Sequence, residues 1–140
     1  MGDLTDAFMK LARARMCPNT PMQYAIPAAL EGDQSHLDAM MKKVKARADL
    51  VLNRLEKLDG FSCVRPRGAF YVFPSITTPG SSTDQEFIVD FLKETGVVTV
   101  PGSGFGQKPG TKHMRIVLLP IEEQLTRAMD LLEEFVLNRS

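Results

Sequence analysis

The sequence has 140 residues, which is enough for one compact domain and too few for two full ones. Apolar residues make up 44% of it and charged residues 24%, which allows a hydrophobic core and excludes disorder over most of its length. The 17 basic and 17 acidic residues give a net charge of zero, which argues against a nucleic-acid partner, because such proteins usually carry a basic excess.

Membranes, disulfides and metals are not expected either. No stretch reaches the roughly 18 consecutive apolar residues of a membrane span. Cys17 and Cys63 show no spacing typical of a disulfide framework, so the protein is expected in the reducing cytoplasm. His36 and His113 lie far from each other and from any cluster of cysteines or carboxylates, so no metal site is expected.

The first part of the chain predicts two short helices. Residues 3–16 carry apolar side chains at helical spacing and end before a Cys-Pro-Asn turn. A T-P-M-Q run starting at Thr20 predicts a capping box, in which the Thr20 side chain accepts from an amide three residues on and Pro21 takes the first helical position. Pro27 is expected to kink the second helix or to delay its start, and Gly32 to end it.

A third, long helix is predicted to begin at Ser35, to end before Gly60 and to pack across a sheet. Its apolar stripe consists of Leu37, Met40, Met41, Val44, Ala48, Val51, Leu52, Leu55 and Leu58. The dense basic run Lys42, Lys43, Lys45 and Arg47 is expected to form the solvent-exposed face of this helix.

The middle of the chain changes to the period of strands. Residues 61–64 and 69–73 flank an R-P-R-G turn signal and predict a hairpin or a bent strand pair. Thr83 or Ser82 is expected to cap a helix that ends at Gly96.

The last third predicts strands at residues 97–100 and 113–119, with an irregular loop over residues 101–110 between them. Pro120 is expected to start a final helix. Together the elements predict an α+β fold, in which a small, mostly antiparallel sheet is packed with helices.

Residues 102–106 (G-S-G-F-G) follow a predicted strand and allow two interpretations. A phosphate-binding loop would have to open a helix, and the Gln-Lys-Pro-Gly that follows does not start one cleanly. We therefore expect an ordinary loop, whose glycines permit positive φ angles and close backbone approach.

Arg115 is the candidate binding residue, because it lies in a predicted strand that is otherwise nearly all apolar. An arginine in such a place needs a partner for its charge, and its planar guanidinium suits the two oxygens of a carboxylate. That carboxylate is either an Asp or Glu of the protein or part of a ligand.

Three segments together resemble the class I and II aminotransferases. Residues 65–74 (R-P-R-G-A-F-Y-V-F-P) are similar to a P-x-G-A-F-Y-x-F-P strand of that family, and residues 96–106 (G-V-V-T-V-P-G-S-G-F-G) to its G-V-x-V-x-P-G-S-x-F-G strand and loop. Residues 114–116 (M-R-I), followed by a P-I-E-E helix start, resemble its last active-site strand. The likeness covers essentially the whole chain and extends back to residues 17–25, which are similar to archaeal and bacterial alanine aminotransferases.

The resemblance implies that residues 33–140 form the C-terminal small domain of such an enzyme and that residues 1–32 return from a missing large domain. The parent enzyme would transfer an amino group between an amino acid, expected to be alanine, and a 2-oxo acid. Its large domain would hold pyridoxal phosphate on a lysine, and two subunits would form a homodimer. By matching position, Arg115 would bind the substrate α-carboxylate.

No lysine of this sequence fits the family's lysine motif, in which a small residue precedes the lysine and glycine and arginine follow. Lys10 follows Met9, and Lys57 follows Glu56. We therefore expect this chain alone to contain no catalytic residue, to bind no cofactor and to be inactive. An alternative is a free-standing, non-catalytic domain that binds small carboxylates or a partner protein.

Overall fold

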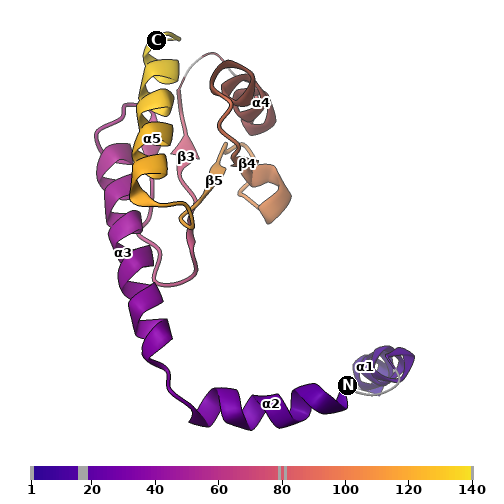
Figure 1. Cartoon of the computed structure of the whole chain (residues 1–140). Coiled ribbons are helices and arrows are strands. Elements are labelled where there is room, and N and C mark those ends of the chain that lie inside the picture. The colour runs from indigo at the N-terminus through magenta and orange to yellow at the C-terminus, as the bar shows by residue number, and fades with distance from the viewer. Residues whose placement is uncertain (1, 16–18, 79, 81, 140) are drawn as a thin grey trace. The chain divides into compact units, whose positions relative to one another are not determined.

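The computed structural model describes residues 2–15, 19–78, 80 and 82–139, and the chain divides into two compact units, residues 1–39 and 40–140. Figure 1 shows the helices and strands along the chain. The helices are α1 (Gly2–Ala14), α2 (Thr20–Glu31), α3 (Ser35–Leu55), α4 (Asp84–Thr95), α5 (Glu122–Leu137) and the 3₁₀ helix η1 (Gly102–Phe105). The strands are β1 (Phe61–Ser62), β2 (Tyr71–Val72), β3 (Ser75–Ile76), β4 (Val100–Pro101) and β5 (Met114–Val117).

The two helices predicted at the start of the chain are present, but the predicted start of α2 is wrong in detail. Asn19, not Thr20, is the N-cap residue, and its side chain makes no capping hydrogen bond. Pro27 does not delay the start, because it lies inside α2, which runs from Thr20 to Glu31. Gly32 caps the C-terminus, as expected. The predicted turn before Asn19 lies largely outside the described residues.

Helices α1 and α2 have no buried side chain. Because helices this short depend on tertiary packing for stability, we expect amide hydrogen exchange in α1 and α2 to be much faster than in β5. Exchange measured by NMR on the 140-residue chain checks this. Equal protection of the two regions would contradict it.

Helix α3 begins at Ser35 as predicted and ends at Leu55, three residues before the end of the apolar stripe. The amides of Lys57 and Leu58 bond to carbonyls only three residues back, so the chain tightens into a turn that still buries Leu58. Lys42, Lys43 and Lys45 are exposed, as expected. Arg47 is not: it is half-buried and donates to the Glu122 carboxylate over 3.2 Å and to the Leu119 carbonyl over 2.7 Å.

The predicted pairing of residues 61–64 with residues 69–73 is wrong. Strand β1 instead pairs antiparallel with β3, where the Ser62 and Ser75 hydroxyls lie 2.7 Å apart. Strand β2 pairs antiparallel with β5. Strand β5 is the centre of the antiparallel sheet β2-β5-β4. The order of the strands depends on the pairing of β5 with β2, which lies far back in the sequence. No local turn signal specifies that pairing.

Helices α4 and α5 confirm most of the predicted boundaries. Thr83 caps α4 in a full capping box with Glu86, and Gly96 ends it in the left-handed conformation that favours glycine. Helix α5 starts at Glu122, two residues after the predicted Pro120. Of the predicted strand at residues 97–100, only Val100 lies in β4, and Pro101 of the predicted loop over residues 101–110 belongs to that strand. The rest of the loop contains the single turn η1.

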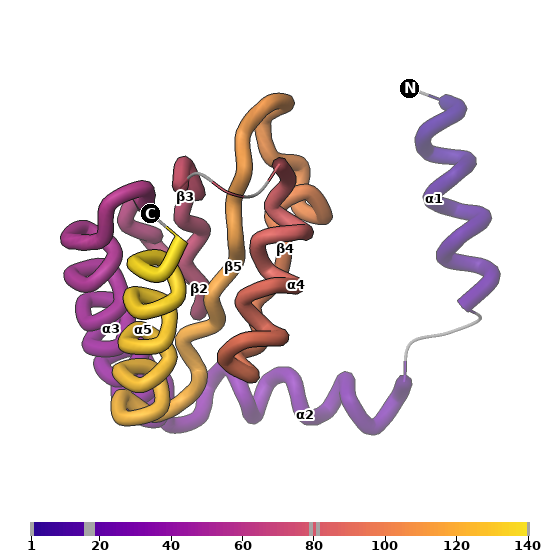
Figure 2. Tube along the Cα trace, turned by 90° about the horizontal axis from the view of Figure 1, so that it is seen from above, coloured from indigo at the N-terminus to yellow at the C-terminus, as the bar shows by residue number. Residues whose placement is uncertain are grey.

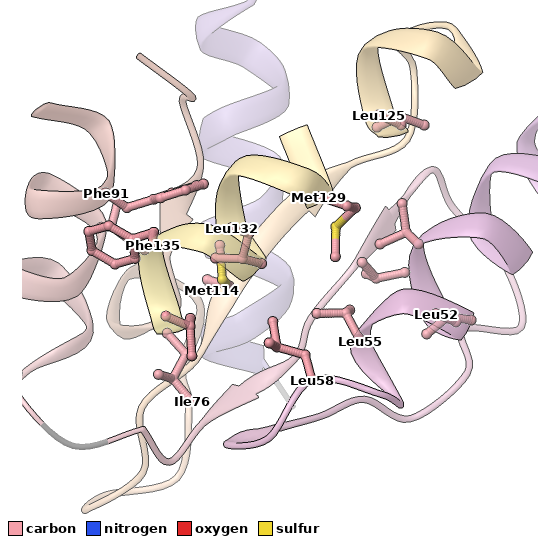
Figure 3. Close-up of a cluster of buried hydrophobic side chains, with 14 of the residues drawn as sticks. Leu52, Leu55, Leu58, Ile76, Phe91, Met114, Leu125, Met129, Leu132 and Phe135 are labelled. Carbon is pink, nitrogen blue, oxygen red and sulfur yellow. The ribbon is translucent and has the colours of Figure 1, made fainter. Parts of the chain in front are cut away.

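The second unit has one hydrophobic core, formed by α3, α4, α5 and the strands. Helices α3 and α5 lie side by side (Figures 1 and 2), linked by Arg54, which bonds to Asp130 and Glu133 over 2.5 and 2.6 Å. These hydrogen bonds, the one to Glu133 above all, raise the pKa of Arg54 above its ordinary value. Figure 3 shows buried side chains of this core, with Phe91 and Phe135 next to each other. The predicted α+β fold is confirmed.

Candidate functional site around Arg115

Strand β5 holds Arg115 on the side of the sheet opposite the core. Met114 and Leu118 are 0% and 1% exposed, and Ile116 between them packs against the core. Because side chains alternate along a strand, Arg115 points to the other face. There it is half-buried.

Two aromatic rings contact the Arg115 guanidinium. Its central carbon lies 4.0 Å from the ring centre of Phe105 and 5.2 Å from that of Tyr71. A guanidinium attracts the electron-rich face of an aromatic ring, so these contacts help to hold the Arg115 side chain in place. They do not supply hydrogen-bond acceptors, and the Arg115 Nε is buried with no hydrogen-bond partner.

The other half-buried arginines provide a comparison. Arg47 pairs with Glu122, Arg54 with Asp130 and Glu133, and Arg139 with Asp90 and Glu94. Arg115 is the one half-buried arginine that pairs with no carboxylate among residues 2–15, 19–78, 80 and 82–139. Of the two partners considered from the sequence, the internal carboxylate is therefore absent from the described structure. The guanidinium retains unused donors for a carboxylate from outside.

The 3₁₀ turn η1 places Phe105 beside Arg115. The turn is tied to β5 at its start, where the Gly102 amide donates to the His113 carbonyl over 2.8 Å. It is tied to α4 one residue later, where the Ser103 amide donates to the Asp84 carboxylate over 2.6 Å. The chain is thus fixed just before Phe105.

Gly102 is needed where the turn meets β5, because no room is left for a side chain. A Cβ atom there would lie 2.5 Å from Gln107 Oε1, 2.6 Å from His113 Cβ and 2.9 Å from Phe73 Cζ. The Phe73 and His113 rings are stacked, with centres 4.9 Å apart, and cannot both move aside without breaking this contact.

We therefore expect Gly102→Ala to lower the free energy of unfolding by about 1–3 kcal/mol through overpacking. Urea denaturation of the 140-residue chain measures this. Gly104→Ala is the matched control in the same turn, since a Cβ there meets nothing within 4 Å. An equal effect of the two substitutions would contradict the explanation.

The metal and phosphate expectations concern the histidines and residues 102–106. In the described part of the chain, no group of three or more His, Cys, Asp or Glu side chains could hold a metal ion. Residues 102–105 form a single 3₁₀ turn rather than the start of an α-helix, in line with the ordinary-loop interpretation. Cys63 is a free thiol whose pKa is raised by burial, and Cys17 lies outside the described residues.

An apolar pocket of about 460 Å³ lies between α3 and residues 66–70, away from Arg115. Its walls include Met40, Met41 and Phe70, and its charged neighbours Lys45 and Arg67 are exposed. The residues that line this pocket include no buried polar group that could orient a small ligand, whereas Arg115 provides a half-buried charged group.

The lysines do not fit the attachment of pyridoxal phosphate. Every lysine is exposed except Lys112, which is half-buried. A lysine that forms a covalent bond to a carbonyl compound is usually activated by a desolvated pocket or a neighbouring cation. The exposure of these lysines therefore does not match that of a covalent anchor.

The sequence named Arg115 as a candidate but did not predict its contacts with Tyr71 and Phe105 or the bond from Ser103 to Asp84. Tyr71 and Phe105 lie within the two motif segments, yet their contact with Arg115 depends on strand pairing and on the fold of η1. Asp84 had been read only as part of the start of α4, so its hydrogen bond with the Ser103 amide was not predicted. None of the helices in the described residues has the length and apolar content needed to cross a membrane.

Comparison with known proteins identifies the family. A family model for class I and II aminotransferases matches residues 3–132. A probable mitochondrial alanine aminotransferase of Dictyostelium discoideum is 36% identical over 88% of this chain and 27% of its own length.

Solved structures agree with this match. The alanine aminotransferase from Pyrococcus furiosus is 43% identical with a TM-score of 0.87, over 99% of this chain and 35% of its own. The aromatic aminotransferase of Pyrococcus horikoshii is 37% identical with a TM-score of 0.81, and the match covers 91% of this chain and 34% of that protein. The chain thus spans about a third of the length of the proteins it matches. It belongs to the class I and II aminotransferase family.

Proposed function

We propose that this chain is the C-terminal small domain of an aminotransferase and that Arg115 binds the α-carboxylate of its substrate. The observation that carries the proposal is the half-buried guanidinium of Arg115, which has unused donors and no carboxylate partner in the described structure. A charge in such a place costs free energy unless a ligand meets it. A bidentate contact with a carboxylate meets it well.

The parent enzyme transfers an amino group from an amino acid to a 2-oxo acid. Alanine and 2-oxoglutarate are the expected pair, because alanine aminotransferases are prominent among the relatives. The family implies pyridoxal phosphate, which stabilises negative charge on the substrate when bound. This chain's part is to bind and orient the substrate through Arg115, while protein outside residues 1–140 holds the cofactor.

Apolar surface supports a missing large domain as the first partner. In α1 and α2, Leu11 and Leu30 are 71% and 74% exposed, and around the pocket beside α3 Met41 is 58% exposed. Apolar surface of this kind usually packs against another domain or subunit. We propose that residues 1–32 return from the large domain, that residues 33–140 form the small domain, and that two parent subunits form a homodimer in the cytoplasm.

The DNA upstream of Met1 tests the proposal. An open reading frame that continues upstream and encodes the lysine motif is expected, and its full product should transfer the amino group of alanine to 2-oxoglutarate. A translation start at Met1 would contradict this and favour the alternative, a free-standing domain that binds small carboxylates or a partner protein.

The 140-residue chain alone is expected not to attach pyridoxal phosphate at one specific lysine, because every lysine other than Lys112 is exposed and Lys112 is only half-buried. Absorbance spectra of the purified chain with added cofactor measure this. A stoichiometric band that disappears when one lysine is replaced would overturn the prediction.

A further inference from the structure

The contact between Phe105 and Arg115 has a geometry that suits ligand binding. The central carbon of the guanidinium lies over the Phe105 ring, 4.0 Å from the ring centre. A ring covers the face of a guanidinium, whereas a carboxylate binds in its plane, at the N–H edge. Phe105 can therefore hold the group in place without occupying the donors that a substrate would use.

Phe105 is not a core residue. It is 48% exposed, and it belongs to a 3₁₀ helix of only four residues. A half-exposed ring on so short an element needs an outside support if it is to stay against Arg115. That support comes from Asp84.

Asp84 is the first residue of α4 and is only 4% exposed. No cation pairs with it among the residues that the structure describes. Its carboxylate instead accepts the Ser103 amide over 2.6 Å and the Gln85 amide over 3.0 Å. A buried carboxylate is costly without such bonds, and hydrogen bonds to a charged acceptor are stronger than neutral ones.

We propose that Asp84 and Phe105 are positioning residues for Arg115. Asp84 fixes the backbone at Ser103, two residues before Phe105, and Phe105 fixes the plane of the guanidinium. The inference rests on the proposed role of Arg115, because its consequence is a correctly oriented donor edge for the substrate carboxylate.

NMR of the 15N-labelled 140-residue chain tests the contact itself. The Arg115 Nε–H proton is expected upfield, shifted by the ring current of Phe105, and its signal is assigned by its loss in Arg115→Lys. Phe105→Leu should move the signal downfield, and Phe105→Tyr should keep it. Asp84→Ala should shift it in the same direction as Phe105→Leu. An unchanged signal in Phe105→Leu would overturn the inference whatever the function.

Kinetics of the full-length protein test the consequence. Phe105→Leu and Asp84→Ala are each expected to raise KM for the amino acid by about 2- to 30-fold, the range of a cation–π contact, with little change for the amine that lacks the carboxylate. If Asp84 acts through Phe105, the double variant is no worse than Phe105→Leu. Thr83→Ala is the matched control, because it weakens the same end of α4 but removes no bond to η1.

The two failures are distinguishable. If Arg115→Ala leaves the preference for the amino acid intact, the proposed function is wrong. If Arg115→Ala abolishes that preference while Phe105→Leu and Asp84→Ala behave as the native protein, the role of Arg115 stands and the positioning inference is wrong. If Thr83→Ala raised KM for the amino acid as much as Asp84→Ala does, Asp84 would only stabilise α4, and its proposed positioning role would be wrong.

Discussion

Phe135→Ala is expected to lower the free energy of unfolding by about 3–5 kcal/mol, enough to leave the domain marginally stable. Phe135 is 2% exposed and lies between two rings of α4, with centres 5.3 Å from Phe87 and 5.2 Å from Phe91. The Arg139 guanidinium covers it at 4.2 Å. Truncation leaves a cavity and also removes these ring contacts.

Urea denaturation of the 140-residue chain measures the loss. Leu137→Ala is the matched control on the same helix, because Leu137 is 71% exposed and its truncation should change stability by no more than about 0.5 kcal/mol. Similar midpoints for the two variants would contradict the account of the core.

The helices could largely be predicted from the sequence, because their signals are local. The apolar stripe after Ser35 was correct, and so was the cap of α4, for which Thr83 was one of the two residues considered. The similar pattern at Thr20 failed because the preceding Asn19, an equally good N-cap residue, takes that position.

The strand pairing could not be predicted in the same way. Residues 61–64 and 69–73 looked like a hairpin because only a short turn separates them. In the structure Tyr71 lies opposite Val117, and Phe61 lies opposite Ile76. These partners are chosen by burial of one face of each strand in the common core, which no short window of sequence contains.

In the candidate site, too, local features could be predicted from the sequence and contacts between distant residues could not. Arg115 could be named as a candidate because a charge within an apolar strand is unusual wherever the strand lies. The rings of Phe105 and Tyr71 could not, because they reach Arg115 from a separate turn and a separate strand. That no carboxylate of the described residues pairs with Arg115 could not be predicted either, because it depends on where the carboxylates lie in space.

Replacement of Arg115 in the full-length protein is expected to have the largest effect on function. Arg115→Ala should cost about 2–5 kcal/mol of substrate affinity, largely because the substrate carboxylate is left unpaired. Arg115→Lys should recover little of this, since a point charge does not reproduce two parallel hydrogen bonds or the stacking on Phe105.

The most direct test of the central claim compares an amino acid with its amine. The half-reaction of the full-length protein is measured with alanine and with ethylamine, for the native protein and for Arg115→Ala and Arg115→Lys. The account predicts that both variants lose most of the preference for alanine while their reaction with ethylamine stays close to that of the native protein. Folded variants that keep the native preference for alanine would show that Arg115 does not bind the substrate carboxylate.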